Sequence, residues 1–142
     1  MQNDAPQHVN RDRHGRGIRG LLIPAHLPIH ESRDAFFAHQ VAEAVADLDS
    51  RLGDQLRHVS FGFQEIPSAA DVAFANGQIP LGRLVKSNPV SIVIFQRPIE
   101  ARSADSQMCI RIIRDVLAEY VALYLGLEPY QVDSNYLGPE IR

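Results

Sequence analysis

Two carboxylates stand four residues apart in the C-terminal part of the chain. Asp115 and Glu119 lie in the apolar run "MCIRIIRDVLAEYVALYLGLEP", and a third carboxylate, Glu128, closes that run. A spacing of four places two side chains on one face of a helix. Two carboxylates so placed can exchange a proton or hold a hard cation. A solvated polar stripe that also holds Arg111 explains the same spacing, and we prefer this simpler interpretation.

The histidines and the single cysteine offer weaker sites. His26 and His30 have the H-x-x-x-H spacing of zinc ligands, but that spacing joins two imidazoles only on a helix. Pro24 and Pro28 predict an extended segment there instead. Cys109 lies in the apolar run, where burial makes a thiol a poor nucleophile, so we interpret it as a core residue. One cysteine also excludes an internal disulfide and a cysteine metal cage.

Composition narrows the class of protein. A chain of 142 residues, 45% of them hydrophobic, can build one domain with a buried core. Its formal net charge of -3 argues against bulk electrostatic binding of nucleic acid. No apolar run reaches the roughly 18 residues that a membrane span requires, and the N-terminus is too polar for a secretory signal. We therefore expect a cytoplasmic protein that does not contact the membrane.

The first twenty residues differ from the rest of the chain. The stretch "RDRHGRGIRG" predicts a flexible basic arm over residues 1–20, ahead of a single domain over residues 21–142. Such an arm can contact RNA, phosphate or an acidic partner. No aromatic side chain alternates with the arginines to stack on bases, so we favour a solvated tail. The arginines of this arm are Arg11, Arg13, Arg16 and Arg19.

Hydrophobic periodicity predicts two principal helices. The first covers residues 33–52, with Ser32 as its N-cap. The second runs from about 104 to 125, with Ser103 as its N-cap and a glycine just past its end, and is expected to be central and largely buried. The buried stripe of the first helix is predicted to be Phe37, Val41, Ala44, Leu48 and Leu52.

Two strands are expected between these helices. Residues 57–66 alternate between apolar and polar side chains and predict a strand with one face on the core. Residues 90–96 are apolar on both faces and predict an interior strand that Pro98 ends. Residues 67–90 form a long connection, with room for one short strand in "IPLGRLV". The core face of the first strand is formed by Val59, Phe61 and Phe63.

This order of helix, strand, long loop, strand and glycine-terminated apolar helix resembles the minimal zincin family of small bacterial metallopeptidase-like proteins. The resemblance covers about residues 11–133. The stretches that carry it are "RDRHGRG", "IPLGRL", "IVIFQRPIEAR" and "IIRDVLAEYVALYLGLEPYQVD". It implies a single α+β domain with a small mixed sheet and two principal helices. The C-terminal helix would correspond to the active-site helix of the family.

The active-site helix of zincins carries H-E-x-x-H-x-x-G, in which two histidines bind zinc and the glutamate activates a zinc-bound water. Aligning the family's glycine with Gly126 places Glu119 and Leu123 at the two histidines. Tyr120 then stands at the glutamate, and the third ligand falls near Pro129.

A shift of one residue keeps Glu119 at the glutamate. Ala118 and Ala122 then replace the histidines, Leu125 the glycine and Glu128 the third ligand. Both registers lose both histidines, and alanine and leucine donate no lone pair to a metal. We therefore expect no zinc or other cofactor to bind.

The resemblance and the missing ligands together imply a catalytically inactive domain that binds an unknown protein or peptide partner. Binding is expected through the basic arm or through the groove where substrate lies in active relatives, with the strand at residues 90–96 offering an edge. One alternative is a hydrolase with altered chemistry, which would use Glu119 with Asp115 or Glu128 and would draw in His30 or His58. Another is an RNA- or ribosome-associated protein that acts through the arm.

Overall fold

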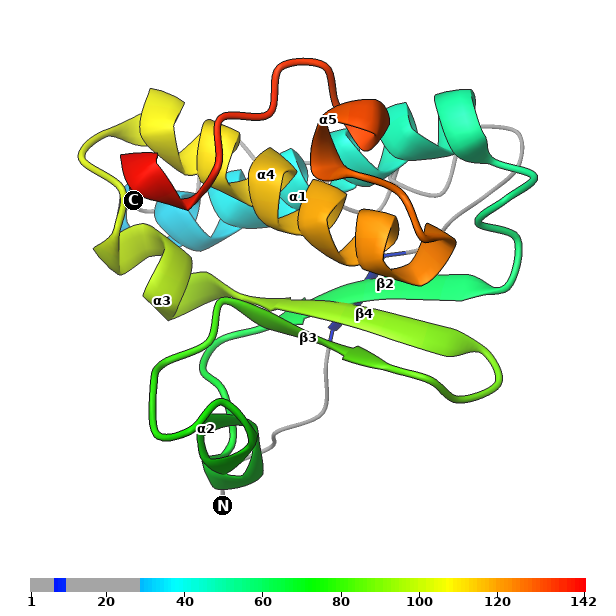
Figure 1. The fold of residues 1–142 in the computed structure, drawn as a ribbon. Helices are drawn as coiled ribbons and strands as arrows, with labels where there is room; N and C mark the ends of the chain where they lie inside the picture. The colour runs from blue at the N-terminus through cyan, green and yellow to red at the C-terminus, as the bar shows by residue number, and fades with distance from the viewer. Residues whose placement is uncertain (1–6, 10–28) are drawn as a thin grey trace.

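The computed structural model describes residues 7–9 and 29–142, with side chains from residue 33 onward. The chain is a mixed α+β fold, as predicted (Figure 1). Its elements are β1 (Gln7–Val9), α1 (Ile29–Leu52), β2 (Val59–Gln64), α2 (Ala69–Phe74), β3 (Gly82–Val85), β4 (Val90–Phe95), α3 (Gln96–Ala101), α4 (Ser106–Leu125), α5 (Pro129–Val132) and the 3-10 helix η2 (Pro139–Ile141).

The four strands among the described residues form one mixed sheet in the order β1-β2-β4-β3. β2 and β4 are parallel, whereas β1 and β3 are antiparallel to their neighbours. The expected interior strand is confirmed, because β4 lies between β2 and β3 and pairs with both. The expectation that residues 90–96 offer a peptide edge is therefore wrong, since both sides of β4 are occupied. Among the described strands, the edge of the sheet beside β4 belongs to β3.

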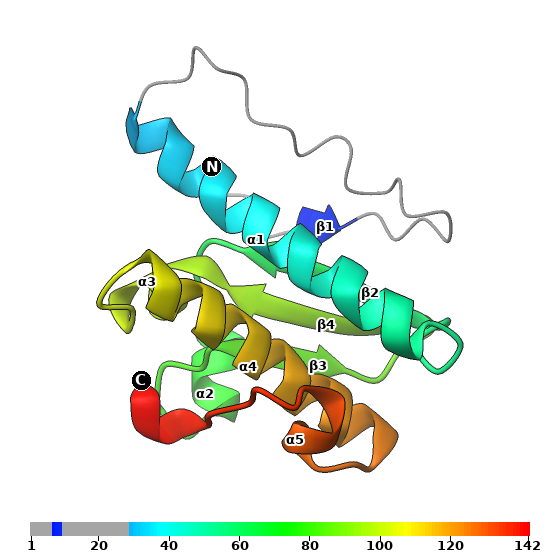
Figure 2. The same cartoon turned by 90° about the horizontal axis from the view of Figure 1, so that it is seen from above.

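The two principal helices, α1 and α4, lie side by side on one face of the sheet (Figures 1 and 2). The core lies between the helices and that face. Four residues of the predicted α1 stripe are buried, and Leu52 is half-buried against them. From β2 the core receives Val59, Phe61 and Phe63, as the alternation predicts. On α4 almost every apolar side chain from Cys109 to Ala122 is buried.

Both predicted helix starts are displaced. α1 begins at Ile29, directly after Pro28, so Ser32 lies inside the helix and does not cap it. A proline just before a helix costs nothing, because the first N–H groups have no intrahelical partner. At α4 the cap is Asp105, whose side chain accepts the N–H of Met108 at 2.8 Å. Ser103 instead donates its hydroxyl to a carbonyl of α3.

The short helices are not predicted from the sequence pattern. α2 stands inside the connection that was expected to hold only one strand, and β3 forms that strand. Pro98 does not end β4 but lies in the first turn of α3, where its missing N–H leaves no helical bond unmade. The tail, which shows little period, contains α5 and η2. Elements of three to six residues are too short to display a period of 3.6.

The N-terminal arm lies mostly outside the described residues, and with it Arg11, Arg13, Arg16 and Arg19. Within the predicted arm, Gln7–Val9 form β1 and pair with Phe61–Phe63 of β2. No helix in the part of the chain that the structure describes is long and apolar enough to cross a membrane.

Candidate functional site

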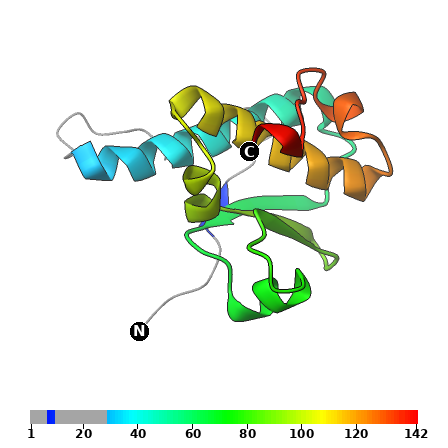
Figure 3. The ribbon, with the colours of Figure 1, turned by 60° about the vertical axis from the view of Figure 1, so that its left-hand side comes forward.

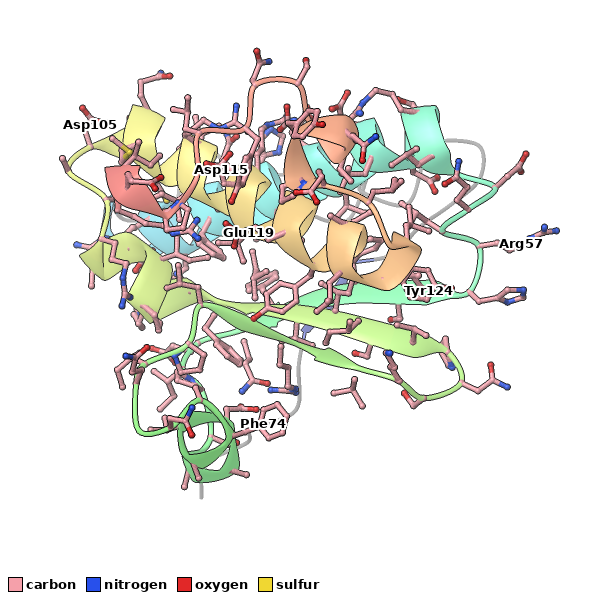
Figure 4. All side chains as sticks on the ribbon, in the orientation of Figure 1. Arg57, Phe74, Asp105, Asp115, Glu119 and Tyr124 are labelled. Atoms are coloured by element: carbon pink, nitrogen blue, oxygen red, sulfur yellow. The ribbon has the colours of Figure 1, made fainter. Side chains whose placement is uncertain are left out.

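A row of polar side chains on α4 holds the end of the chain. Arg111, Asp115 and Glu119 recur every four residues and so share one face of the helix, which we call the α4 stripe. The residues that lie on this face are Tyr136–Arg142, which we call the C-terminal strap. Figure 4 shows Asp115 and Glu119 on the part of α4 that the C-terminal segment crosses.

Asp115 is the centre of the stripe. It is completely buried, with 0% of its surface exposed. Its carboxylate accepts the Nε–H of Arg111 at 2.8 Å and the main-chain N–H groups of Leu137 and Gly138 at 3.2 and 3.1 Å. A buried carboxylate persists only when such donors replace its hydration. The solvated stripe preferred from the sequence is therefore wrong, because the strap covers it.

Glu119 holds the two side chains at the ends of the strap. The phenol of Tyr136 donates to Oε2 at 2.5 Å, and Nη2 of Arg142 lies 2.7 and 3.0 Å from the two oxygens. Burial and the hydrogen bond to Glu119 raise the pKa of the Tyr136 phenol well above its usual range, so it remains a donor. Both oxygens of Glu119 are thus occupied by the chain's own donors.

Backbone geometry brings the strap to Asp115. Gly138 has φ 96° and ψ 179°, a conformation that is essentially restricted to glycine. A Cβ placed there would stand 3.0 Å from Oε1 of Glu140. The glycine therefore allows two consecutive N–H groups to face one carboxylate.

A short hinge precedes the strap at Asp133–Asn135. The Asp133 carboxylate accepts Nη2 of Arg111 at 2.6 Å, and its other oxygen accepts the N–H of Asn135 at 2.9 Å. Burial alone would raise the pKa of Asp133, but these two donors hold it below its ordinary value. The carbonyl of Asp133 also accepts the N–H of Tyr136 at 3.0 Å, which closes a tight turn. Arg111 thus binds Asp115 and the hinge together.

In the register set by Gly126, the side chains at the motif positions either contact other parts of the chain or are exposed to solvent. Glu119 is bound to the strap, as described. The Tyr120 hydroxyl donates to the carbonyl of Gly82 on β3 at 2.7 Å, and burial raises the pKa of this phenol. Leu123 is 65% exposed. Gly126 ends α4 with φ 73°, the left-handed turn that the motif's glycine implies.

In the shifted register, Ala118 and Ala122 replace the histidines. They are 0% and 2% exposed and lie in the core. Side chains large enough to bind a metal would not fit at these positions without disturbing the packing. Neither register therefore presents a pair of donors to a cleft.

The remaining candidates do not join the α4 stripe. Glu128 is exposed and caps α5 through a reciprocal pair with Gln131. His58 is exposed beside β2, and Cys109 is buried, which raises its pKa. His30 lies in α1 with its side chain undescribed, and His26 lies outside the described residues. Within the described part of the chain, no group of three or more His, Cys, Asp or Glu side chains could hold a metal ion.

The outer edge of β3 runs beside α4, and along this strand exposure rises from the buried Gly82 to the exposed Val85. The N–H of Phe95 donates to the carbonyl of Leu81, so alternation directs the main-chain groups of Gly82 and Leu84 away from β4. Tyr120 takes the outward carbonyl of Gly82. No other described strand pairs with this edge. It is therefore a short template for an added strand.

The site as a whole binds groups of the polypeptide chain itself. The α4 stripe binds two amides, a phenol and a guanidinium, all from the strap, and β3 offers further main-chain groups. No model of a known protein family matches this chain, and no curated protein matches it at a significant level. Sequence reasoning missed Tyr136, Gly138 and Arg142. The only local signal was a Gly-Pro pair, which marks a turn but not its partner.

Proposed function

We propose that this chain is a zincin-like domain that performs no zinc proteolysis and works by binding a partner protein. The framework supports the resemblance. Two principal helices pack on one face of a small mixed sheet, α4 lies beside an antiparallel edge strand, and a left-handed glycine ends α4.

The contacts of Glu119 are the main support for this proposal. Glu119 is the one carboxylate that stands at a motif position in both alignments with the zincin helix. The strap occupies both of its oxygens. A hydrolytic role for Glu119 with Asp115 would require both carboxylates to face an open cleft. Asp115 is instead fully buried, so this arrangement supports a binding domain over an altered hydrolase.

The partner we infer is an extended protein segment that pairs with the outer edge of β3. Zincins bind substrates by strand addition, and an inactive relative can retain that mode of binding. Gly82 is buried and its outward carbonyl is bound by Tyr120, so the part of this edge open to pairing begins at Leu84, next to Val85, which is 42% exposed. Main-chain hydrogen bonds would supply the affinity, and neighbouring exposed side chains the selectivity.

Metal content tests the first half of the proposal. Untagged protein is analysed by elemental mass spectrometry, titrated with zinc while its melting temperature is followed, and assayed for cleavage of an unstructured protein. The expected result is no stoichiometric zinc, no stabilisation and no cleavage. Stoichiometric zinc with cleavage that Glu119→Gln abolishes would restore the altered hydrolase.

Edge pairing tests the second half. Lys86 continues the outward alternation of β3, so Lys86→Pro removes an outward N–H and spares the bonds to β4. Lys86→Ala is the matched control, because it removes the charge and keeps the N–H. A captured partner that binds the wild type and Lys86→Ala but not Lys86→Pro supports strand addition. Absence of a reproducible partner for the wild type counts against the proposal.

A further inference from the structure

The strap is a compact ligand for the α4 stripe. Its donors meet acceptors from α4 at two points, Asp115 and Glu119, and Tyr136 and Ile141 pack partly against the core. All of these acceptors lie on one rigid helix. Any copy of the strap that reaches this helix in the same orientation makes the same contacts.

The hinge allows the strap to leave while α5 stays. Val132, the last residue of α5, is 0% exposed, and its carbonyl accepts Nη1 of Arg51 from α1 at 2.6 Å. α5 is thus fixed to the body of the domain. Beyond it, the tight turn at Asp133–Asn135 is exposed at Ser134 and Asn135, so it can straighten in water.

The closed arrangement leaves apolar surface exposed near the hinge. Leu137 and Tyr130 expose 56% and 63% of their surface. A second molecule at the hinge would cover this apolar surface.

We propose that the strap is exchanged between two copies of this chain. In the exchanged dimer, the strap of each copy lies on the α4 stripe of the other. The contacts of Asp115 and Glu119 are regained in full, so the closed and exchanged forms differ only in the hinge and in the new interface around it. Because the strap must first leave a buried carboxylate, exchange is slow. The inference rests on the strap contacts alone and is independent of the proposed function.

Charge reversal provides the test. Glu119→Arg and Arg142→Glu each place like charges at the strap contact, both within one copy and between identical copies. An equimolar mixture restores opposite charges only across an exchanged pair. Light scattering is expected to show the single variants at the 15.8 kDa of one chain and the mixture at twice that mass. The double variant restores opposite charges both within one copy and between copies, so it is the control and should have the same mass as the wild type.

A mixture that stays monomeric while both variants are folded overturns the proposal. So does a single variant that dimerises as readily as the mixture, because its dimer would not use the strap. A second variant avoids the charged groups altogether. Deletion of Ser134 and Asn135 removes the turn that returns the strap to its own α4, so this variant should be a dimer. A folded, monomeric deletion variant contradicts exchange, and adding Arg142→Glu to it should weaken the dimer.

Discussion

Two aspartates on opposite faces of the sheet fasten short segments with the same chemistry but different burial. Asp115 on α4 binds an arginine and two main-chain N–H groups and is 0% exposed. Asp71 on α2 accepts Nη1 of Arg83 at 3.0 Å and the N–H of Ser68 at 2.9 Å, and its side chain is 12% exposed. Figure 3 shows α2 on the side of the sheet away from α1 and α4.

The segments themselves explain the difference. The strap adds Tyr136 and Ile141 to the core, whereas α2 buries none of its residues and ends at Phe74, which is 93% exposed. Hydrogen bonds to Asp71 therefore hold α2 with little help from packing, while those to Asp115 are sealed by apolar contacts. The loss of stability on removing a carboxylate therefore depends on how completely the surrounding residues bury it.

The largest effect is expected from Asp115→Ala. It leaves Nε of Arg111 and the N–H groups of Leu137 and Gly138 without their acceptor, so the free energy of unfolding should fall by about 3 kcal/mol. Urea denaturation followed by circular dichroism measures the loss. Asp47→Ala is the control, because the ion pairs of Asp47 with described residues, Arg51 and Arg114, are partly exposed, and this substitution should cost less than about 1 kcal/mol. Equal losses for the two variants would show that burial does not strengthen the contacts of Asp115.

The long elements could be predicted from sequence because burial imposes a period on them. The α1 stripe, the core face of β2 and the interior position of β4 all follow from hydrophobic spacing. The short helices could not be predicted. A proline such as Pro98 is compatible both with the end of a strand and with the first turn of a helix, so the sequence alone does not distinguish them.

The candidate site could be predicted only in part. The spacing of Arg111, Asp115 and Glu119 correctly places them on one helical face. What covers that face is decided by residues far along the chain, with Arg142 lying 23 positions from Glu119. No local pattern encodes that contact, so a buried row of charges looks the same in sequence as a solvated one.

The second effect should come from Gly138→Ala. At φ 96° and ψ 179° a side chain is strained, and the new Cβ would press on Glu140. We expect a loss of about 2 kcal/mol in the free energy of unfolding, measured by the same denaturation. Gly126→Ala is the matched control, because its φ is 73° and nothing lies within 4 Å of the added Cβ. It should cost about 1 kcal/mol. If the order is reversed, the strap is not held by the backbone geometry described.

A smaller global effect is expected from Asp71→Ala. The variant loses the cap of α2 and its ion pair with Arg83, which should cost about 1 kcal/mol. Because α2 is scarcely packed, the main result should be local. Limited proteolysis should cut between residues 66 and 80 several-fold faster, while cutting in the strap is unchanged. Asp115→Ala should show the opposite pattern of cleavage, and identical patterns would mean that the two segments unfold as one.

The smallest effect concerns pH. The pKa of Asp133 is held below its ordinary value of 3.8, so the unfolded chain binds more protons than the folded chain as the pH falls. The stabilisation from this carboxylate is therefore complete above the unfolded value and is lost as the pH drops through the lower folded value. Asp133→Asn removes this contribution at every pH. The difference in unfolding free energy between wild type and variant should be constant near neutral pH and should narrow only in acid. A difference that instead widens in acid would show that Arg111 and Asn135 do not hold the charged form.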